Sequence, residues 1–189
     1  MRAILLACSL LLPGVAQTQT APAAPQVQTD LTQALLGDWT GVLEYRDYSE
    51  PPTSTKRVQL PTWLSIQTQP EGLRFHYIYD DGPAKTVESA PTVVIDTAAK
   101  TYKVIETDHV AESYTISGLE ALKQGRGELL LSGIGKDNNK PAEIHITLTL
   151  RRNLLISLEE TRPAASQEPF VFRHRYVFTR SKPPDTTKH

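Results

Sequence analysis

Residues 35–45 read LLGDWTGVLEY, and this stretch decides the fold. It joins a short apolar helical turn to a glycine, a tryptophan and a strand of alternating character. Gly37 allows the sharp bend that the backbone needs here, and the odd-numbered residues 39–45 fall on one face of the following strand. A helical plug followed by such a strand predicts the start of a closed antiparallel barrel.

The chain after Trp39 reads as strand and turn throughout. Asp30 is the expected N-cap of a short helix that ends at Leu36. Period-two alternation, bounded by turn residues, predicts strands at 39–48, 57–68, 73–79, 85–95, 101–107, 112–117, 129–134, 143–151, 154–161 and 170–180. Pro91 should break the fourth of these in two. No helix is long enough for a crossover, so we predict an all-β fold: a single up-and-down antiparallel β-barrel of about 8–10 strands with a short N-terminal helix. A β-sandwich is the alternative.

The N-terminus has the layout of a secretory signal peptide. Arg2 precedes an apolar run that ends at Pro13 and Gly14, and cleavage is expected after Ala16. Lipidation at Cys8 is the alternative, although the apolar run continues beyond that residue. The expected divisions are therefore a signal peptide at 1–16, a flexible leader at 17–29, a β-barrel domain at 30–180 and a disordered tail at 181–189. Such a chain is expected to be secreted or periplasmic.

The amino-acid composition and the net charge limit the kinds of partner that the chain can have. The chain has 189 residues, of which 39% are hydrophobic and 22% charged, and its formal net charge is −1. So small a net charge produces only a weak electrostatic field, which argues against nucleic acid as a partner. The apolar run near the N-terminus is too short to span a membrane. The single cysteine lies within the signal segment, so the mature chain should contain no disulfide.

Gly37, Asp38 and Trp39 match a Gly-x-Trp signature on a first strand that follows a short helical turn. In this respect the chain resembles the calycin superfamily, which comprises lipocalins, fatty-acid-binding proteins and their bacterial relatives. The resemblance implies that an arginine near the end of the last strand packs over the tryptophan. Arg180 is the expected residue, with Arg175 as the second choice. Gly37, Trp39 and Arg180 would then be a structural signature.

The resemblance also implies a small apolar or amphipathic ligand inside the barrel. The expected pocket wall consists of aromatic residues, namely Tyr45, Phe75, Tyr77, Tyr79, Phe172 and Tyr176. The same rings could instead fill a solid core, in which case the barrel would be an envelope structural or protein-interaction module presenting an outer strand such as 58–66. Among bacterial barrels with a similar opening, the nitrobindin type binds haem through a histidine near the C-terminus, a role that His174 or His145 could take. No cofactor is otherwise expected.

Histidines and carboxylates offer few catalytic arrangements. His76 with Asp80, and His109 with Asp108 and Glu106, are the closest groupings to metal ligands, but neither has zinc-site spacing, so we predict no metal site. Glu159 and Glu160 could form a carboxylate pair for acid–base chemistry, or cross-strand ion pairs with Arg173 and Arg175 on a solvated face. No nucleophile motif is present. We therefore expect a binding protein rather than an enzyme.

Overall fold

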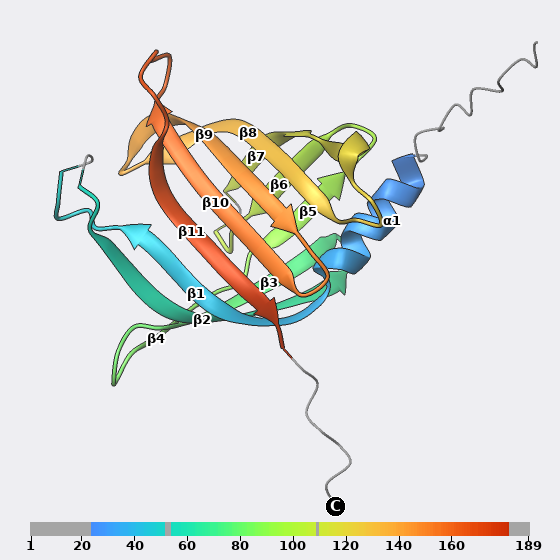
Figure 1. Ribbon diagram of the computed structural model, residues 1–189, viewed down its shortest axis with the longest axis horizontal. Coiled ribbons are helices and arrows are strands. Elements are labelled where there is room, and N and C mark those ends of the chain that lie inside the picture. The colour runs from blue at the N-terminus through green and yellow to red at the C-terminus, as the bar shows by residue number, and fades with distance from the viewer. Residues whose placement is uncertain (1–23, 52–53, 109, 182–189) are drawn as a thin grey trace, which may run out of the picture.

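A computed structural model describes residues 24–51, 54–108 and 110–181 of the chain. Figure 1 shows a curved sheet wrapped around an interior, with one helix lying at the end of the barrel. The elements in chain order are α1 (Ala24–Leu35), β1 (Gly37–Arg46), β2 (Arg57–Gln69), β3 (Gly72–Asp80), β4 (Thr86–Ser89), β5 (Thr92–Asp96), β6 (Thr101–Ile105), β7 (Ala111–Ser117), η1 (Leu119–Ala121), β8 (Gly127–Asp137), β9 (Lys140–Leu150), β10 (Leu154–Pro163) and β11 (Val171–Arg180).

The sheet closes on itself. Strand β1 pairs with β2 on one side and with β11 on the other, and β2 also pairs with β3. Ten strands form the closed ring, and β4 pairs only with β3. Every pairing is antiparallel and neighbours follow chain order apart from this insertion. The predicted single up-and-down barrel is confirmed, and the alternative of two stacked sheets is wrong because the first and last strands are hydrogen-bonded to each other.

Particular residues explain where the strands close and turn. A Cβ atom at Gly41 would collide with the carbonyl of Val177, so only glycine lets β1 approach β11 this closely. Asn138 and Asn139 both have positive φ and form the two-residue turn between β8 and β9. Pro91 separates β4 from β5, which confirms the predicted break.

The helix covers one end of the barrel and completes its core. Leu31 and Leu35 are buried, with 1% and 2% of their surface exposed. The Trp39 indole Nε1 donates a hydrogen bond to the Leu35 carbonyl at 2.9 Å, which joins the helix to the first strand. The helical plug predicted from residues 35–45 therefore seals this end of the interior.

The predicted start of the helix is wrong. α1 begins at Ala24 rather than at Asp30, so residues 24–29, which were expected to be leader, are helical. Val27 packs against the core and the Gln28 side chain accepts a hydrogen bond from the Thr97 amide, and these tertiary contacts stabilise turns whose composition alone suggests disorder. The predicted signal peptide, leader residues 17–23, tail residues 182–189 and His109 lie outside the described residues. None of the helical segments within the described ranges combines the length and apolar character that a membrane crossing requires.

Candidate functional site

The two halves of the barrel interior differ in how completely side chains fill them. Near α1, the inward-facing Trp39 and Phe178 each expose only 1% of their surface. Farther from the helix, Leu43, Tyr77 and Tyr176 are only half-buried although strands surround them. These side chains therefore keep some accessible surface, whereas the core near α1 is closely packed. We call this part of the interior the open half of the lumen and define it by its inward-facing residues Leu43, Tyr77, Tyr79, Ser157 and Tyr176.

Three tyrosines from β3 and β11 form the inner wall of the open half. The hydroxyls of Tyr79 and Tyr176 are hydrogen-bonded at 3.0 Å. The Tyr77 ring centroid lies 5.9 Å from that of Tyr79 and 5.4 Å from that of Tyr176. Loss of hydration raises the pKa of Tyr77 and of Tyr176 well above the ordinary value, so both hydroxyls stay neutral. This tyrosine group presents apolar ring faces together with neutral hydrogen-bonding groups.

The residues predicted as a pocket wall separate into several locations. The tyrosine group lies together in the open half. Tyr45 is half-buried and opposite His174 in the β1–β11 register. Phe75 is only 5% exposed and belongs to the packed core. Phe172 lies instead beneath Arg57, whose guanidinium carbon is 4.4 Å from the ring centroid.

The Gly-x-Trp stretch and Arg180 come together at the end of the barrel that α1 covers. The Arg180 guanidinium carbon lies 4.1 Å from the Trp39 ring centroid. Its Nη1 and Nη2 atoms donate hydrogen bonds to the carbonyls of Leu36 (2.5 Å) and Ala34 (2.8 Å). Gly37 has a φ of +110°, and a Cβ there would lie 2.9 Å from Arg180 Nη1. This arrangement ties the first strand, the last strand and the helix to one another.

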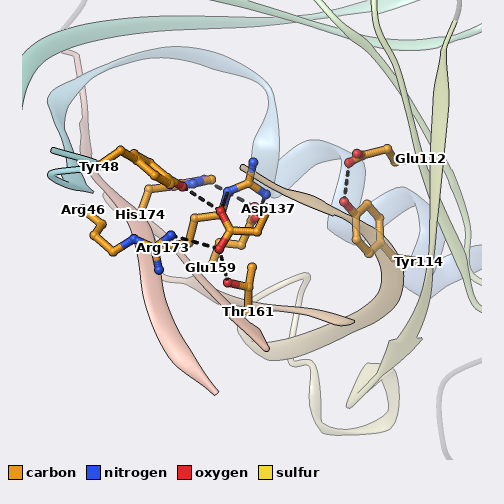
Figure 2. Close-up of polar contacts among 9 residues, drawn as sticks. All are labelled: Arg46, Tyr48, Glu112, Tyr114, Asp137, Glu159, Thr161, Arg173 and His174. Carbon is orange, nitrogen blue, oxygen red and sulfur yellow. Dashed lines mark hydrogen bonds and ion pairs between the residues drawn. The ribbon is translucent and has the colours of Figure 1, made fainter. Parts of the chain in front are cut away.

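A carboxylate at the end of β8 collects four donors from different elements (Figure 2). Asp137 accepts hydrogen bonds from Arg46 Nη2 at 3.1 Å, Tyr48 Oη at 2.9 Å and Thr161 Oγ1 at 2.9 Å. Arg173 Nε lies 3.7 Å from Asp137 Oδ1, the oxygen that also accepts from Tyr48. Burial opposes ionisation, but the hydrogen bonds and the arginines outweigh it and hold the pKa of Asp137 below its usual value. Asp137 is therefore an ionised hub that joins β1, β8, β10 and β11.

An irregularity in β11 brings a second carboxylate into this network. Glu159 of β10 pairs in register with His174, whereas Glu160 pairs with Phe172, so Arg173 is an extra residue on β11. As a result both Arg173 and His174 reach Glu159. Arg173 Nη1 donates to Glu159 Oε1 at 2.5 Å, and His174 Nε2 lies 3.4 Å from Oε2.

Burial is the main influence on the protonation of Glu159 and His174. Loss of hydration raises the pKa of Glu159 despite the charge of Arg173. Loss of hydration, together with the charge of Arg173, lowers the pKa of His174 to about 4. His174 is therefore neutral near pH 7, and its contact with Glu159 is not an ion pair at that pH.

A third acidic region lies in the connection between β6 and β7 and at the start of β7. The Tyr114 hydroxyl donates to Glu112 Oε2 at 2.5 Å, and burial followed by this hydrogen bond raises the pKa of Tyr114. Burial and the charges of Glu112 and Asp108 raise the pKa of Glu106. Gly135 leaves space beside Glu112, since a Cβ there would lie 3.3 Å from its Oε1. After loss of hydration, the charge of Glu106 also contributes to the raised pKa of Tyr77.

The predicted roles of the neighbouring glutamates need correction. Glu159 is 7% exposed and points into the barrel, whereas Glu160 follows it on the alternating strand, so the two do not form a carboxylate pair. Glu159 does pair with Arg173, but inside the barrel rather than on a solvated face. Arg175 pairs with Glu44 on the neighbouring strand at 3.1 Å.

The remaining histidines have individual partners. His76 Nε2 lies 3.0 Å from Glu88 of β4 rather than joining Asp80. His145 stacks on Phe170 with ring centroids 3.8 Å apart. Within residues 24–51, 54–108 and 110–181, no group of three or more His, Cys, Asp or Glu side chains is arranged to hold a metal ion.

Sequence reasoning missed Arg46, Asp137, Thr161 and Glu112 as site residues. The strand was expected to end at residue 134, so Asp137 fell outside it. Leu129 and Leu131 lie on the inward face, and residues 133, 135 and 137 continue the same period-two pattern. A longer predicted strand would therefore have placed Asp137 on the inward face. By contrast, no sequence pattern indicates that Arg173 is an extra residue on β11.

Comparison with known proteins gives no further assignment: no protein-family model matches the chain, and a search of curated proteins finds no relative.

Proposed function

We propose that this protein is a calycin-like binding protein that holds a small amphipathic molecule in the open half of its lumen. The observation that carries the proposal is the contrast within single strands. Trp39 and Phe178 are sealed at one end of β1 and β11, whereas Leu43 and Tyr176 on the same strands retain accessible surface. Apolar walls with a few placed polar groups are typical of small-molecule sites.

The tyrosine group and the polar network around Asp137 and Glu159 suggest how the ligand would lie. The tyrosine group and Leu43 would contact an apolar chain, and the polar network beyond them would face its head group. Apart from the neutral His174, the charged side chains that contact one another there are Arg46, Arg173, Asp137 and Glu159, and Glu112 accepts a hydrogen bond from Tyr114 nearby. Among the ion pairs of the described residues, neither Glu106 nor Glu112 has a cationic partner. A cationic or neutral head group is therefore favoured over an anionic one.

Family and location extend the same proposal. The Gly-x-Trp stretch beneath Arg180 and the closed meander support assignment to the calycin superfamily. The signal-peptide layout of residues 1–16 supports export to the periplasm or the exterior. A carrier of this type would act on ligands outside the cytoplasm.

The test is a binding titration with three fluorescent amphiphiles of equal alkyl length, which carry a trimethylammonium, a glycoside or a carboxylate head group. We expect the affinity to fall in that order. Ser157→Phe should weaken binding by about tenfold or more, because Ser157 lies between Leu148 and Tyr176 in the register and a phenyl group there would occupy the open half.

Ser113→Phe is the matched control, since Ser113 is exposed on the outer face of β7. It should bind as the unmodified protein does. Failure of the unmodified protein to bind any of the three amphiphiles, or equal affinity in the two variants, would contradict the proposal.

A second candidate is a protein-interaction module that acts through the outer face of β1, β2 and β3. Trp63 is 45% exposed and borders a hollow of about 200 Å³ with Asp38 and Ile78. Trp63→Ala distinguishes the two functions. Amphiphile binding that survives this change supports the lumen, whereas loss of a stoichiometric partner from envelope extracts supports the outer face.

A further inference from the structure

Four arginines line a hollow at the α1 end of the barrel, on the opposite side of the packed core from the open half. The hollow has a volume of about 630 Å³. The charged residues in its wall are Arg126, Arg151, Arg152, Arg180 and Asp30. Pockets of this size hold small organic molecules. The hollow is therefore large enough for more than a simple ion.

Backbone turns fix the positions of these arginines. Residues 123–126 form a tight turn in which the amides of Lys123 and Arg126 each donate to the carbonyl of the other residue. Gly125 in this turn has a φ of +67°, and a Cβ there would collide with the backbone of Asp30. The turn is thus docked directly against α1, which holds Arg126 at the rim of the hollow.

The second and third arginines come from the turn between β9 and β10, which is held to the last strand. The Arg151 amide donates to the Leu154 carbonyl at 2.8 Å, and the Arg180 amide donates to the Asn153 carbonyl at 3.2 Å. Arg180 also donates through Nε to the Arg152 carbonyl at 3.4 Å. Its contacts with Trp39 and with the end of α1 hold the guanidinium in place, and the hydrogen bonds to Ala34, Leu36 and Arg152 use three of its five N–H donors.

The hollow carries excess positive charge. Among the ion pairs of the described residues, none involves Arg126, Arg151, Arg152 or Arg180. Asp30, the one carboxylate in the wall, accepts a hydrogen bond from Gln26 instead. Burial and the nearby charge of Arg126 lower the pKa of Arg180, as expected for cations that lack a counter-charge. This concentration of positive charge stands out in a chain whose net charge is −1.

We propose that this hollow is a second binding site, for a phosphate group carried by a small organic molecule. Guanidinium groups present planar pairs of N–H donors that match phosphate oxygens, and converging arginines favour a multiply charged anion. The volume accommodates the organic part as well as the phosphate. The site is separate from the proposed ligand site, because Leu31, Leu35 and the packed core lie between them.

The test is calorimetric titration of the full chain with inorganic phosphate, pyrophosphate and glycerol 3-phosphate at low and at physiological ionic strength. We expect glycerol 3-phosphate and pyrophosphate to bind, with an affinity that falls as salt is added. Arg126→Gln with Arg152→Gln should weaken this binding by about tenfold or more, because each change removes a charge-assisted donor. Arg180 is left unchanged, since it supports the fold.

Arg74→Gln with Lys103→Gln is the matched control. Both residues are exposed on the barrel wall, and the pair alters the net charge by the same amount. It should leave binding unchanged. Absence of binding by every phosphate probe at low salt, or equal weakening in the two double variants, would overturn the proposal.

Vesicles of phosphatidylglycerol, with phosphatidylcholine vesicles as the reference, identify the source of the phosphate. Binding to the anionic vesicles that the Arg126/Arg152 double variant abolishes would support a phosphate in a lipid head group. Binding of glycerol 3-phosphate without vesicle binding would support a soluble phosphorylated molecule. Vesicle binding that both double variants reduce equally would instead reflect general surface charge and count against the site.

Discussion

His174 should make the stability of the barrel depend on pH between about 4 and 6.5. Its pKa is about 4 in the folded protein and 6.5 in the unfolded chain, because burial and the charge of Arg173 disfavour the imidazolium. Between these values the unfolded chain binds the proton and the folded protein does not. The stabilising contribution is therefore complete above about pH 6.5 and is lost as the pH falls toward 4.

The size of the effect follows from the two pKa values. At about 1.4 kcal/mol for each pH unit, the fall from 6.5 to about 4 corresponds to about 3 kcal/mol in the free energy of unfolding. This is an upper limit, since the His174 side chain keeps 23% of its surface exposed. Glu159 acts in the opposite direction, because its raised pKa lets the folded protein bind a proton first as the pH falls.

The difference between the unmodified protein and His174→Gln isolates this contribution. Urea unfolding, followed by far-ultraviolet circular dichroism at several pH values from 7 to 4, measures both free energies. We expect the unmodified protein to lose up to about 3 kcal/mol more than the variant across this range. Parallel curves for the two proteins would refute the reasoning, since His174 would then titrate alike in the folded and unfolded states.

Two further substitutions test the packing of the barrel. Asp137→Ala should lower the free energy of unfolding by about 3–5 kcal/mol, because it leaves Arg46, whose side chain is 8% exposed, without its counter-charge. Urea unfolding measures this loss. The matched change Glu143→Ala removes a more exposed ion pair and should lower the free energy of unfolding much less. Equal losses for the two variants would contradict the role of Asp137 as an ionised hub. Trp39→Ala should cost about 3–5 kcal/mol through lost burial and lower the melting temperature by several degrees. An unchanged melting curve would show that Trp39 does not belong to the core.

The barrel could be predicted from local sequence because its causes are local. Alternating strands and short turns specify a meander, and Gly41 permits the close approach of the first and last strands. The start of α1 could not be predicted, since residues 24–29 are stabilised by tertiary contacts such as that between Gln28 and Thr97.

The polar network was largely hidden from sequence reasoning. Aspartate is common in turns, so Asp137 did not stand out in the sequence. Only the closure of the barrel brings it to Arg46, which lies far from it in the chain. Glu159 was expected on a solvated face, but it lies on the inward face of β10 together with the buried Leu155 and Thr161. The extra residue in β11 lets both Arg173 and His174 reach it. A bulge of this kind arises from the pairing of two strands, so neither strand alone reveals it.

The most direct test of the account is the location of a bound amphiphile. Nuclear Overhauser effects can be measured between the alkyl chain of a bound alkyltrimethylammonium ligand and the aromatic protons of the protein. We predict contacts to the rings of Tyr77, Tyr79 and Tyr176. Contacts confined to Trp63 on the outer face would contradict a ligand in the lumen.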